Sequence, residues 1–138
     1  MQLTKFSVAF VGLFTAAEAI KNCQTYTADV RETSWNSPAE LDCYAIQASG
    51  ESHEYTVTWK GSDGQKKLAK SGSCTLSVLV NGNDSGIAFG NEDVAEVTKL
   101  AIQKFQQTLD GVLRVGGQGT MVCDGKLANW AISSSAMK

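Results

Sequence analysis

Regular alternation of apolar and polar residues predicts strands in several parts of the chain. Segments 24–30 (QTYTADV), 54–60 (EYTVTWK) and 73–80 (SCTLSVLV) place apolar side chains at every second position. This period of two is typical of strands that bury one face. We expect 54–60 and 73–80 to pair as an antiparallel unit with a long connection. Shorter strands are expected at 112–115, 120–123 and 128–133, with Asp124-Gly125 as a hairpin turn between the last two.

The segment that begins at Ser37 has the signals of a helix start. Ser37 can cap the helix, Pro38 fits its first turn, and Glu40 stands three residues after the cap, as in a capping box. The helix is expected to run from Pro38 to about Ala48 and to end at Gly50. Its predicted buried stripe consists of Leu41, Tyr44, Ala45 and Ala48, next to Cys43.

A longer helix is predicted over residues 91–108. Asn91 can cap it, and Glu92 and Asp93 bring negative charge near the positive end of the helix dipole. Its apolar residues recur three and four positions apart, which predicts one buried face, and Gly111 is expected to end it. The buried face comprises Val94, Val97, Thr98, Ala101, Ile102, Phe105 and Leu109.

The order of these elements indicates the fold class. They follow one another as a strand, a helix, two strands, a second helix and further short strands. Such an order predicts an α+β fold, with one antiparallel sheet and two helices packed on one of its faces. A length of 138 residues fits a single domain.

The first 19 residues have the features of a secretory signal peptide. Lys5 supplies a positive charge, residues 6–16 (FSVAFVGLFTA) are uncharged and mostly apolar, and Ala17-Glu18-Ala19 has small residues where signal peptidase reads them. The apolar run is shorter than the roughly 20 residues of a membrane-spanning helix, and no later run reaches that length. We therefore expect residues 1–19 to be removed and residues 20–138 to form one secreted, extracellular and soluble domain.

The four cysteines all follow the predicted cleavage point. An even number of cysteines in a secreted chain indicates disulfides, here two. Their spacing is unlike that of zinc-binding knuckles, and the chain has one histidine, so no metal site is expected. The residues are Cys23, Cys43, Cys74 and Cys123, and spacing leaves all three pairings open.

Charge and composition exclude two classes of partner. The chain has 12 Lys and Arg against 14 Asp and Glu, a formal net charge of −2. A nucleic-acid-binding domain would usually carry a strongly basic face, and a membrane-surface domain a polybasic one. We therefore expect neither nucleic acid nor a membrane as a partner, and no motif indicates a cofactor.

No complete catalytic site is apparent in the sequence. His53 and Glu54 could act as a base with an orienting carboxylate, and Arg31 or Arg114 could join them in ribonuclease-like chemistry. However, the chain has no G-x-S-x-G nucleophile motif, and nothing marks a particular carboxylate pair as a glycosidase site. We therefore expect no catalytic residues and a solvated His53 at the start of a strand.

Three other features could indicate a ligand or a modification. Residues 115–119 (VGGQG) lack the Lys-Ser/Thr pair of a phosphate-binding loop, so we expect a tight turn or a bulge there. The tryptophans could form a sugar-stacking platform, but core packing is favoured for them. They are Trp35, Trp59 and Trp130. Asn83 begins an N-glycosylation sequon in a polar loop.

Several short motifs, in their order along the chain, resemble a known family. That family is the necrosis-inducing factor domain, found in fungal homologues of a secreted effector from a tomato pathogen. The resemblance covers about residues 42–132, and RVGGQGTMVC followed by WAI is its most specific part. The motifs are DCYAI at 42–46, SGSC at 71–74, GNEDV at 90–94, RVGGQGTMVC at 114–123 and NWAI at 129–132.

The resemblance implies more than the residues show by themselves. The family is similar to the killer-protein-four toxins of fungi and fungal viruses, which implies an α/β sandwich of two antiparallel helices on an antiparallel sheet. It implies disulfides that join Cys43 to Cys74 and Cys23 to Cys123. Toxins of this group are linked to interference with calcium uptake, so an ion channel is one implied cell-surface target. No toxin residue can be carried over to this chain.

These features predict a fungal effector or killer-toxin-like protein. We expect it to act outside the cell as a monomer, on a cell-surface target of a host plant or a competing microbe, by binding and without catalysis. Exposed polar loops at 61–70 and 81–90 are the expected places of target contact. The basic cluster in and beside the first loop consists of Lys60, Lys66, Lys67 and Lys70.

Two alternative functions stay open at this level. One is a small secreted hydrolase, either a nuclease or a glycan-active enzyme, that uses His53 and Glu54. The other is a lectin-like or inhibitor-like binding module. An exposed Trp35 beside a groove would favour the second alternative.

Overall fold

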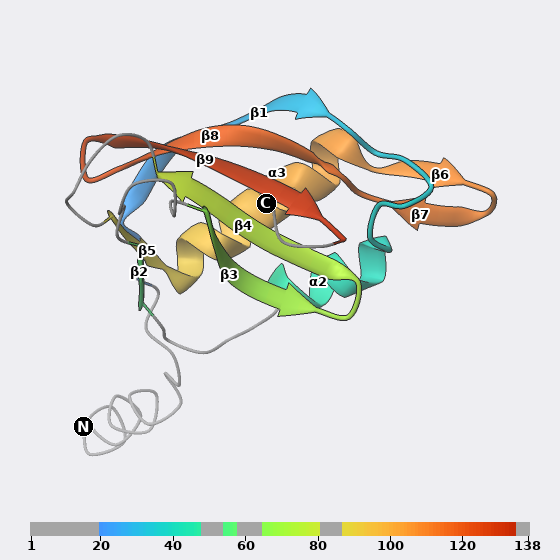
Figure 1. Cartoon of the computed structure of the whole chain (residues 1–138), viewed down its shortest axis with the longest axis horizontal. Coiled ribbons are helices and arrows are strands. Elements are labelled where there is room, and N and C mark those ends of the chain that lie inside the picture. The colour runs from blue at the N-terminus through green and yellow to red at the C-terminus, as the bar shows by residue number, and fades with distance from the viewer. Residues whose placement is uncertain (1–19, 48–53, 58–64, 81–86, 135–138) are drawn as a thin grey trace, which may run out of the picture.

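The computed structural model describes residues 20–47, 54–57, 65–80 and 87–134 of the chain. Within them lie two helices and a largely antiparallel set of strands, which confirms the predicted α+β class (Figure 1). The elements are β1 (Cys23–Arg31), α2 (Glu40–Gln47), β2 (Glu54–Val57), β3 (Gln65–Ser71), β4 (Cys74–Val80), β5 (Ile87–Gly90), α3 (Asn91–Phe105), β6 (Gln107–Leu109), β7 (Val112–Arg114), β8 (Gly117–Cys123) and β9 (Lys126–Ser133).

The main sheet has five strands in the order β1-β8-β9-β4-β3, and all neighbouring strands are antiparallel. Strand β2 pairs with β5, and β6 pairs with β7, in two smaller units. Both helices lie on one face of the main sheet, with α3 behind β1, β8 and β9 and α2 near β3 and β4 (Figure 1). The predicted layering of two helices on one sheet face is therefore confirmed.

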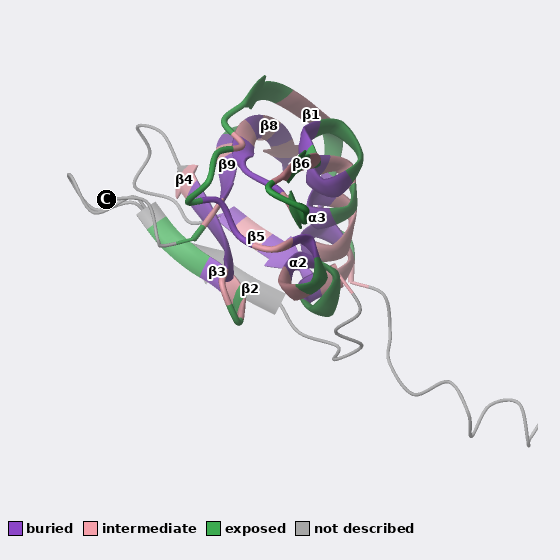
Figure 2. Ribbon diagram, turned by 90° about the vertical axis from the view of Figure 1, so that its right-hand side faces the viewer, coloured by how far each residue is buried: buried purple, intermediate pink, exposed green. Residues whose placement is uncertain are grey.

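The core lies between α3 and the main sheet (Figure 2). Six of the seven residues predicted for the inner face of the long helix are buried in α3, and Leu109 lies beyond its end. Trp130 is fully buried, as expected, and its ring centroid lies 6.1 Å from that of Phe105. Its indole N–H donates to the carbonyl of Thr120, so burial leaves no unpaired donor there. Each large apolar side chain buried here contributes about 1.5–3 kcal/mol.

Two disulfides tie the layers together. Cys23 in β1 is bonded to Cys123 in β8, and Cys43 in α2 is bonded to Cys74 in β4. This is the pairing that the family resemblance implied. The bonded residues are 100 and 31 positions apart, so each bridge restricts the unfolded chain and is worth about 3–5 kcal/mol in the chain-entropy picture.

The glycines of the 115–119 segment allow close packing within a strand. We expected a tight turn or a bulge there, but Gly117 and Gly119 lie in β8. A Cβ on Gly117 would lie 2.5 Å from the Phe105 ring, and one on Gly119 would overlap the carbonyl oxygen of Thr27. The irregular pairing lies on the opposite strand, β1, where the register shifts twice. Glycine is therefore needed because β1 and α3 approach β8 too closely for side chains.

The strand pairing differs from the prediction in two respects. Strand β2 pairs with β5, whereas β4 lies between β3 and β9, so the expected pairing of 54–60 with 73–80 is wrong. Residues 65–70 and 87–90, which we expected to be loops, form β3 and β5. The segment QKKLAK lacks apolar alternation because β3 is an edge strand, whose side chains need not be buried.

The first helix starts later than predicted and buries a different face. It begins at Glu40, because Ser37 accepts a hydrogen bond from the N–H of Ser34 instead of capping the helix. Glu40, Cys43 and Ile46 are its buried residues, spaced three apart. The predicted stripe members Leu41, Tyr44 and Ala45 are exposed, so the prediction is wrong for them. Ala48 and the predicted helix end at Gly50 lie outside the described residues. The Cys43–Cys74 bond turns the Cys43 side of the helix towards the sheet.

The long helix is shorter than predicted at its C-terminal end. It ends at Phe105, and Gln107–Leu109 forms strand β6. Gly111, which we expected to end the helix, has a φ of 78° and turns the β6–β7 hairpin instead. Asn91 is the first helical residue and Gly90 occupies the cap position expected for it. The predicted Asp124-Gly125 turn is confirmed, since both residues have positive φ between β8 and β9.

The substitution Gly119→Ala tests the close packing of β8. We expect it to lower the free energy of unfolding by about 3 kcal/mol, because the new methyl group would overlap the Thr27 carbonyl oxygen and lie 2.7 Å from the Trp130 ring. Urea titration followed by tryptophan fluorescence measures the loss. The control Gly125→Ala, in a turn with a φ of 77° and no other atom within 4 Å, should cost about 1 kcal/mol. Equal losses would contradict the packing argument.

Candidate target-binding site

A groove with apolar walls separates α2 from the β6–β7 hairpin. The hairpin extends beyond the end of the main sheet, and α2 lies beside it (Figure 1). The volume of the groove is about 460 Å³, within the range of small-ligand and peptide-anchoring pockets. We call it the hairpin groove, and its lining residues are Ala39, Glu40, Leu41, Tyr44, Gly111, Val112 and Leu113.

The walls of the hairpin groove are exposed large apolar side chains. Leu41 is 80% exposed, Leu113 46%, Tyr44 45% and Val112 40%. Scattered exposed leucines are ordinary, but four such side chains around one concavity are typical of an interaction surface. These residues come from two elements that are distant in the sequence, which is why periodicity did not reveal them.

Glu40 gives the apolar groove one buried acidic group. The residue is 6% exposed, and the hydroxyl of Tyr44 donates to its carboxylate. The side-chain amide of Gln106, oriented so that its nitrogen donates, lies 3.2 and 3.3 Å from the two Glu40 oxygens. Loss of solvation, followed by the hydrogen bond and charge of Glu40, raises the pKa of Tyr44. Tyr44 and Gln106 are both uncharged partners of this carboxylate.

Backbone contacts hold the two walls of the groove in place. Ala39 and Arg114 form an isolated antiparallel bridge, and the N–H of Val115 donates to the carbonyl of Pro38 at 3.0 Å. The Arg114 guanidinium donates to the carbonyl of Ser37 at 2.7 Å. On the other side of α2, the Asp42 carboxylate accepts two hydrogen bonds from Ser73, which lower the pKa of Asp42. The groove is therefore largely preformed.

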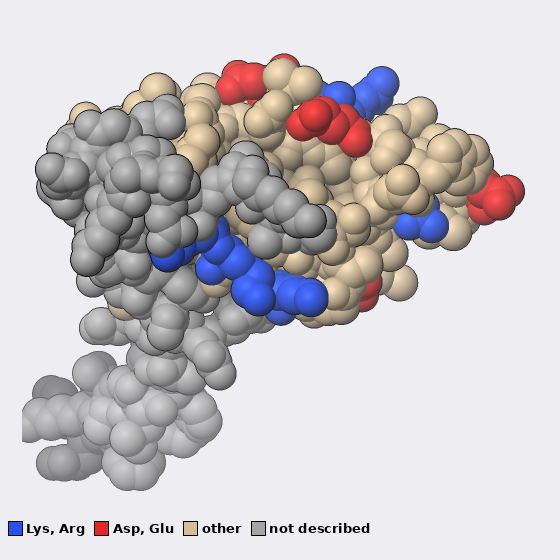
Figure 3. Space-filling view, viewed as in Figure 1, with Lys and Arg blue, Asp and Glu red and all other residues tan. Residues whose placement is uncertain are grey.

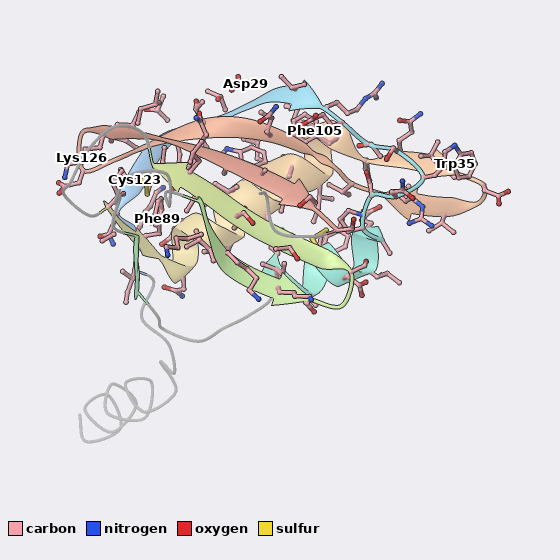
Figure 4. All side chains as sticks on the ribbon, in the orientation of Figure 1. Asp29, Trp35, Phe89, Phe105, Cys123 and Lys126 are labelled. Carbon is pink, nitrogen blue, oxygen red and sulfur yellow. A yellow bond between two sulfur atoms is a disulfide. The ribbon has the colours of Figure 1, made fainter. Side chains whose placement is uncertain are left out.

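A second, more polar groove lies at the ends of β8 and β9. Its volume is about 400 Å³. Its lining residues are Glu32, Ser34, Asn36, Ser37, Gly116, Gly117, Gln118, Ala131, Ile132, Ser133 and Ser134. Trp35 stands between two of them in the sequence and is 61% exposed, so core packing was the wrong expectation for this tryptophan. Figure 4 shows Trp35 at the end of the molecule where the β6–β7 hairpin lies.

Three lysines of the predicted contact cluster lie on the edge strand β3. Lys66, Lys67 and Lys70 are exposed, and Figure 3 shows basic side chains gathered over this strand. Lys60 lies outside the described residues. The cluster therefore sits on a regular strand and not on a loop, and lysines on such a strand also hinder edge-to-edge aggregation.

The structure gives little support to the suggested ribonuclease-like arrangement. Strand β2, which carries Glu54, and strand β7, which carries Arg114, lie at opposite ends of the molecule (Figure 1). Arg31 ends β1 and is exposed. His53 itself lies outside the described residues, as do Trp59 and the sequon residue Asn83, so those predictions stay untested.

Neither a metal-binding cluster nor a membrane-spanning helix is present in the part of the chain that the structure describes. There, no three His, Cys, Asp or Glu side chains are grouped closely enough to hold a metal ion. Neither of the described helices combines the length and the apolar character of a membrane span.

Comparison with known proteins confirms the family resemblance. A family model described as "Pathogen effector; putative necrosis-inducing factor" matches residues 22–123, which include all four cysteines and the hairpin groove. A protein of Penicillium expansum named "Probable chitinase LysM18" is 31% identical over 112 residues, or 78% of this chain. The chain spans only 7% of the length of that relative.

Proposed function

The chain belongs to the pathogen-effector family of necrosis-inducing factors, and on that premise we propose that it is a secreted fungal effector. Residues 1–19 are its leader, and residues 20–138 are the mature domain. The domain acts as a monomer outside the producing cell, on a host plant or a competing microbe, by binding a target and without catalysis. Two buried disulfides support this proposal, because such bonds persist in oxidising surroundings.

The hairpin groove is the observation that carries the binding proposal. Its partner is a segment of a target protein that presents aliphatic or aromatic side chains together with one lysine or arginine. The apolar side chains cover Leu41, Val112 and Leu113, and the basic group approaches Glu40. An acidic residue whose partners Tyr44 and Gln106 are uncharged favours a positively charged partner group over a negative one.

Aspartate substitutions in the groove walls test this proposal. Leu41→Asp combined with Leu113→Asp should reduce necrosis after leaf infiltration, or growth inhibition of competing microbes, by at least about tenfold, because apolar anchors dominate such interfaces. Both side chains are largely exposed, so the urea midpoint should change little.

The matched control is Leu127→Asp. Leu127 is 52% exposed and follows Lys126, which Figure 4 places at the end of the molecule opposite Trp35. This variant should keep full activity. Activity that survives both groove substitutions, or that is lost equally in the control, would contradict binding through the hairpin groove.

The lysines of β3 form a second proposed contact on the same target. Lys66, Lys67 and Lys70, with Lys60, bring positive charge to one edge of an acidic protein. Such a local charge accelerates association with an acidic part of the target surface. We propose that the lysines increase the rate of association with the target and that the hairpin groove determines how strongly the target is bound.

Charge reversal separates target contact from protection of the sheet edge. Lys67→Glu with Lys70→Glu should weaken the effect on target cells severalfold, and more at low than at high salt. Glutamate keeps the edge charged, so aggregation should not increase. Lys99→Glu with Lys104→Glu, on the exposed side of α3, is the control of equal charge change. If both pairs reduce activity alike, net charge and not the β3 lysines is responsible.

A glycan-binding role is the second candidate, and Trp35 favours it. The exposed indole lies beside a groove lined by Ser, Asn, Gln and Glu side chains, a combination that suits sugar rings. The relative named as a chitinase points to chitin as the glycan to try first. This role would also require binding only, not hydrolysis, of the sugar chain.

Trp35→Ala tests the glycan-binding candidate. Calorimetric titration with chitin hexasaccharide should show about tenfold weaker binding in the variant if the indole stacks on a sugar ring. Leu127→Ala, another exposed apolar side chain, should bind like the unmodified protein. Absence of binding to the unmodified protein, or equal binding by both variants, removes this candidate and leaves the hairpin groove unaffected.

A further inference from the structure

The first described residue of the chain is held firmly by the start of α3. The backbone N–H of Ile20 donates to Asn91 Oδ1 at 2.9 Å, and its carbonyl accepts a hydrogen bond from the N–H of Glu92 at 3.1 Å. A Cβ on Gly90 would overlap the Ile20 carbonyl group, so the two backbones are in close contact. The contacts join residues 71 positions apart in the sequence.

The buried carboxylate of Asp93 extends this anchor into β1. Asp93 is 1% exposed and accepts hydrogen bonds from the N–H groups of Asn22, Cys23 and Gly90, at 2.8, 3.0 and 2.8 Å. It also accepts one from the Tyr26 hydroxyl at 2.5 Å. Burial, and then the bond to Asp93, raise the pKa of Tyr26. The N-terminal segment therefore completes the hydrogen bonding of a buried charge, which would be costly to leave unpaired.

Ile20 is also the residue that follows the small-residue pair of the leader. Hydrolysis of the Ala19–Ile20 peptide bond by signal peptidase adds one water molecule, leaving a carboxylate on Ala19 and an amine on Ile20 that takes up a proton. The amide nitrogen, which had one N–H, thereby becomes an ammonium group with three donors and a positive charge.

We propose that the first turn of α3 is a binding site for the α-ammonium group that this cleavage creates on Ile20. Asn91 Oδ1 accepts one of its protons, and the carboxylates of Glu92 and Asp93 supply negative charge nearby. The positive end of the α3 dipole and the Lys21 side chain repel the new positive charge. The repulsion from the helix dipole costs less than about 1 kcal/mol near the surface. A charged donor forms a stronger hydrogen bond than an amide does, so removal of the leader tightens the anchor.

This inference rests on the proposed secretion, in which residues 1–19 are removed. The proposed cleavage point then has a structural consequence, because the residue that it makes the first of the mature chain, Ile20, is bound by the start of α3. Cleavage one or two residues later would remove the Ile20 contacts, and cleavage earlier would leave the amide in place of the ammonium group.

A double-mutant cycle measures the coupling between the terminal amine and Asn91. One chain begins at Ile20, released from a fusion by a protease that leaves no extra residue. The other carries Gly-Ser before Ile20, so it keeps the amide N–H but lacks the charge there. Each is prepared with Asn91 and with Asn91→Ala, refolded with both disulfides closed, and unfolded in urea.

The free amine should lower the unfolding equilibrium constant about fivefold to tenfold relative to the Gly-Ser chain when Asn91 is present. The difference should fall to less than about twofold in Asn91→Ala and should grow in Asn91→Asp, where the ammonium group gains a charged partner. An equal difference with and without Asn91 would overturn the proposed site. Lys99→Ala, on the exposed side of α3, is the control that should leave the difference unchanged.

Mass spectrometry of the protein from culture medium tests the premise separately. A mature chain that begins at Ile20 supports the secretion proposal. A different first residue, or retention inside the cell, would contradict the secretion proposal even if the prepared chains show the coupling. If the chain does begin at Ile20 but shows no coupling to Asn91, only the ammonium site is contradicted.

Discussion

The disulfide between Cys43 and Cys74 is the constraint on which the candidate binding surface depends. It joins α2 to β4 and determines which side of a helix of eight residues faces the sheet. Because Cys43 points inwards, Glu40 and Ile46 are buried with it, and Leu41 and Tyr44 face outwards. The helix has eight residues, and Cys43 is one of the three side chains that it buries. The disulfide therefore turns Leu41 and Tyr44 towards the groove, and the backbone contacts around Ala39 and Arg114 hold the facing hairpin beside them.

The two ends of the molecule are stabilised by different kinds of interaction. At the hairpin end, backbone contacts around Ala39 and Arg114 hold two exposed walls close together. At the other end, the buried carboxylate of Asp93 accepts hydrogen bonds from the N–H groups of Asn22 and Cys23, at the start of β1, and of Gly90, the last residue of β5. The first arrangement leaves apolar side chains exposed for a partner, whereas the second buries the carboxylate that it is built around. This difference supports binding at one end and structural anchoring at the other.

Membership of an effector family and a short match within a long chitinase-named protein agree on one point. Both match most of this chain, and in the chitinase-named protein the matching segment is a small part of a much longer sequence. An apolar groove with a buried glutamate suits protein recognition, and an exposed tryptophan beside polar side chains suits sugar recognition. Both surfaces lie at the same end of the molecule, since Figure 4 places Trp35 at the end where the hairpin lies.

Local patterns in the sequence determined both helices, most of the strands, the inner face of α3, the Asp124-Gly125 hairpin and the fold class, because these depend on side-chain periodicity and turn chemistry. They did not reveal β3, β5 and β6. Tertiary structure decided the rest. The partner of β2 depends on non-local strand pairing. The close approach of β1 and α3 requires glycine in β8, and a disulfide determines which side of α2 is buried. The hairpin groove belongs to this second group. Its walls come from segments 70 residues apart, and no local pattern records which exposed residues meet.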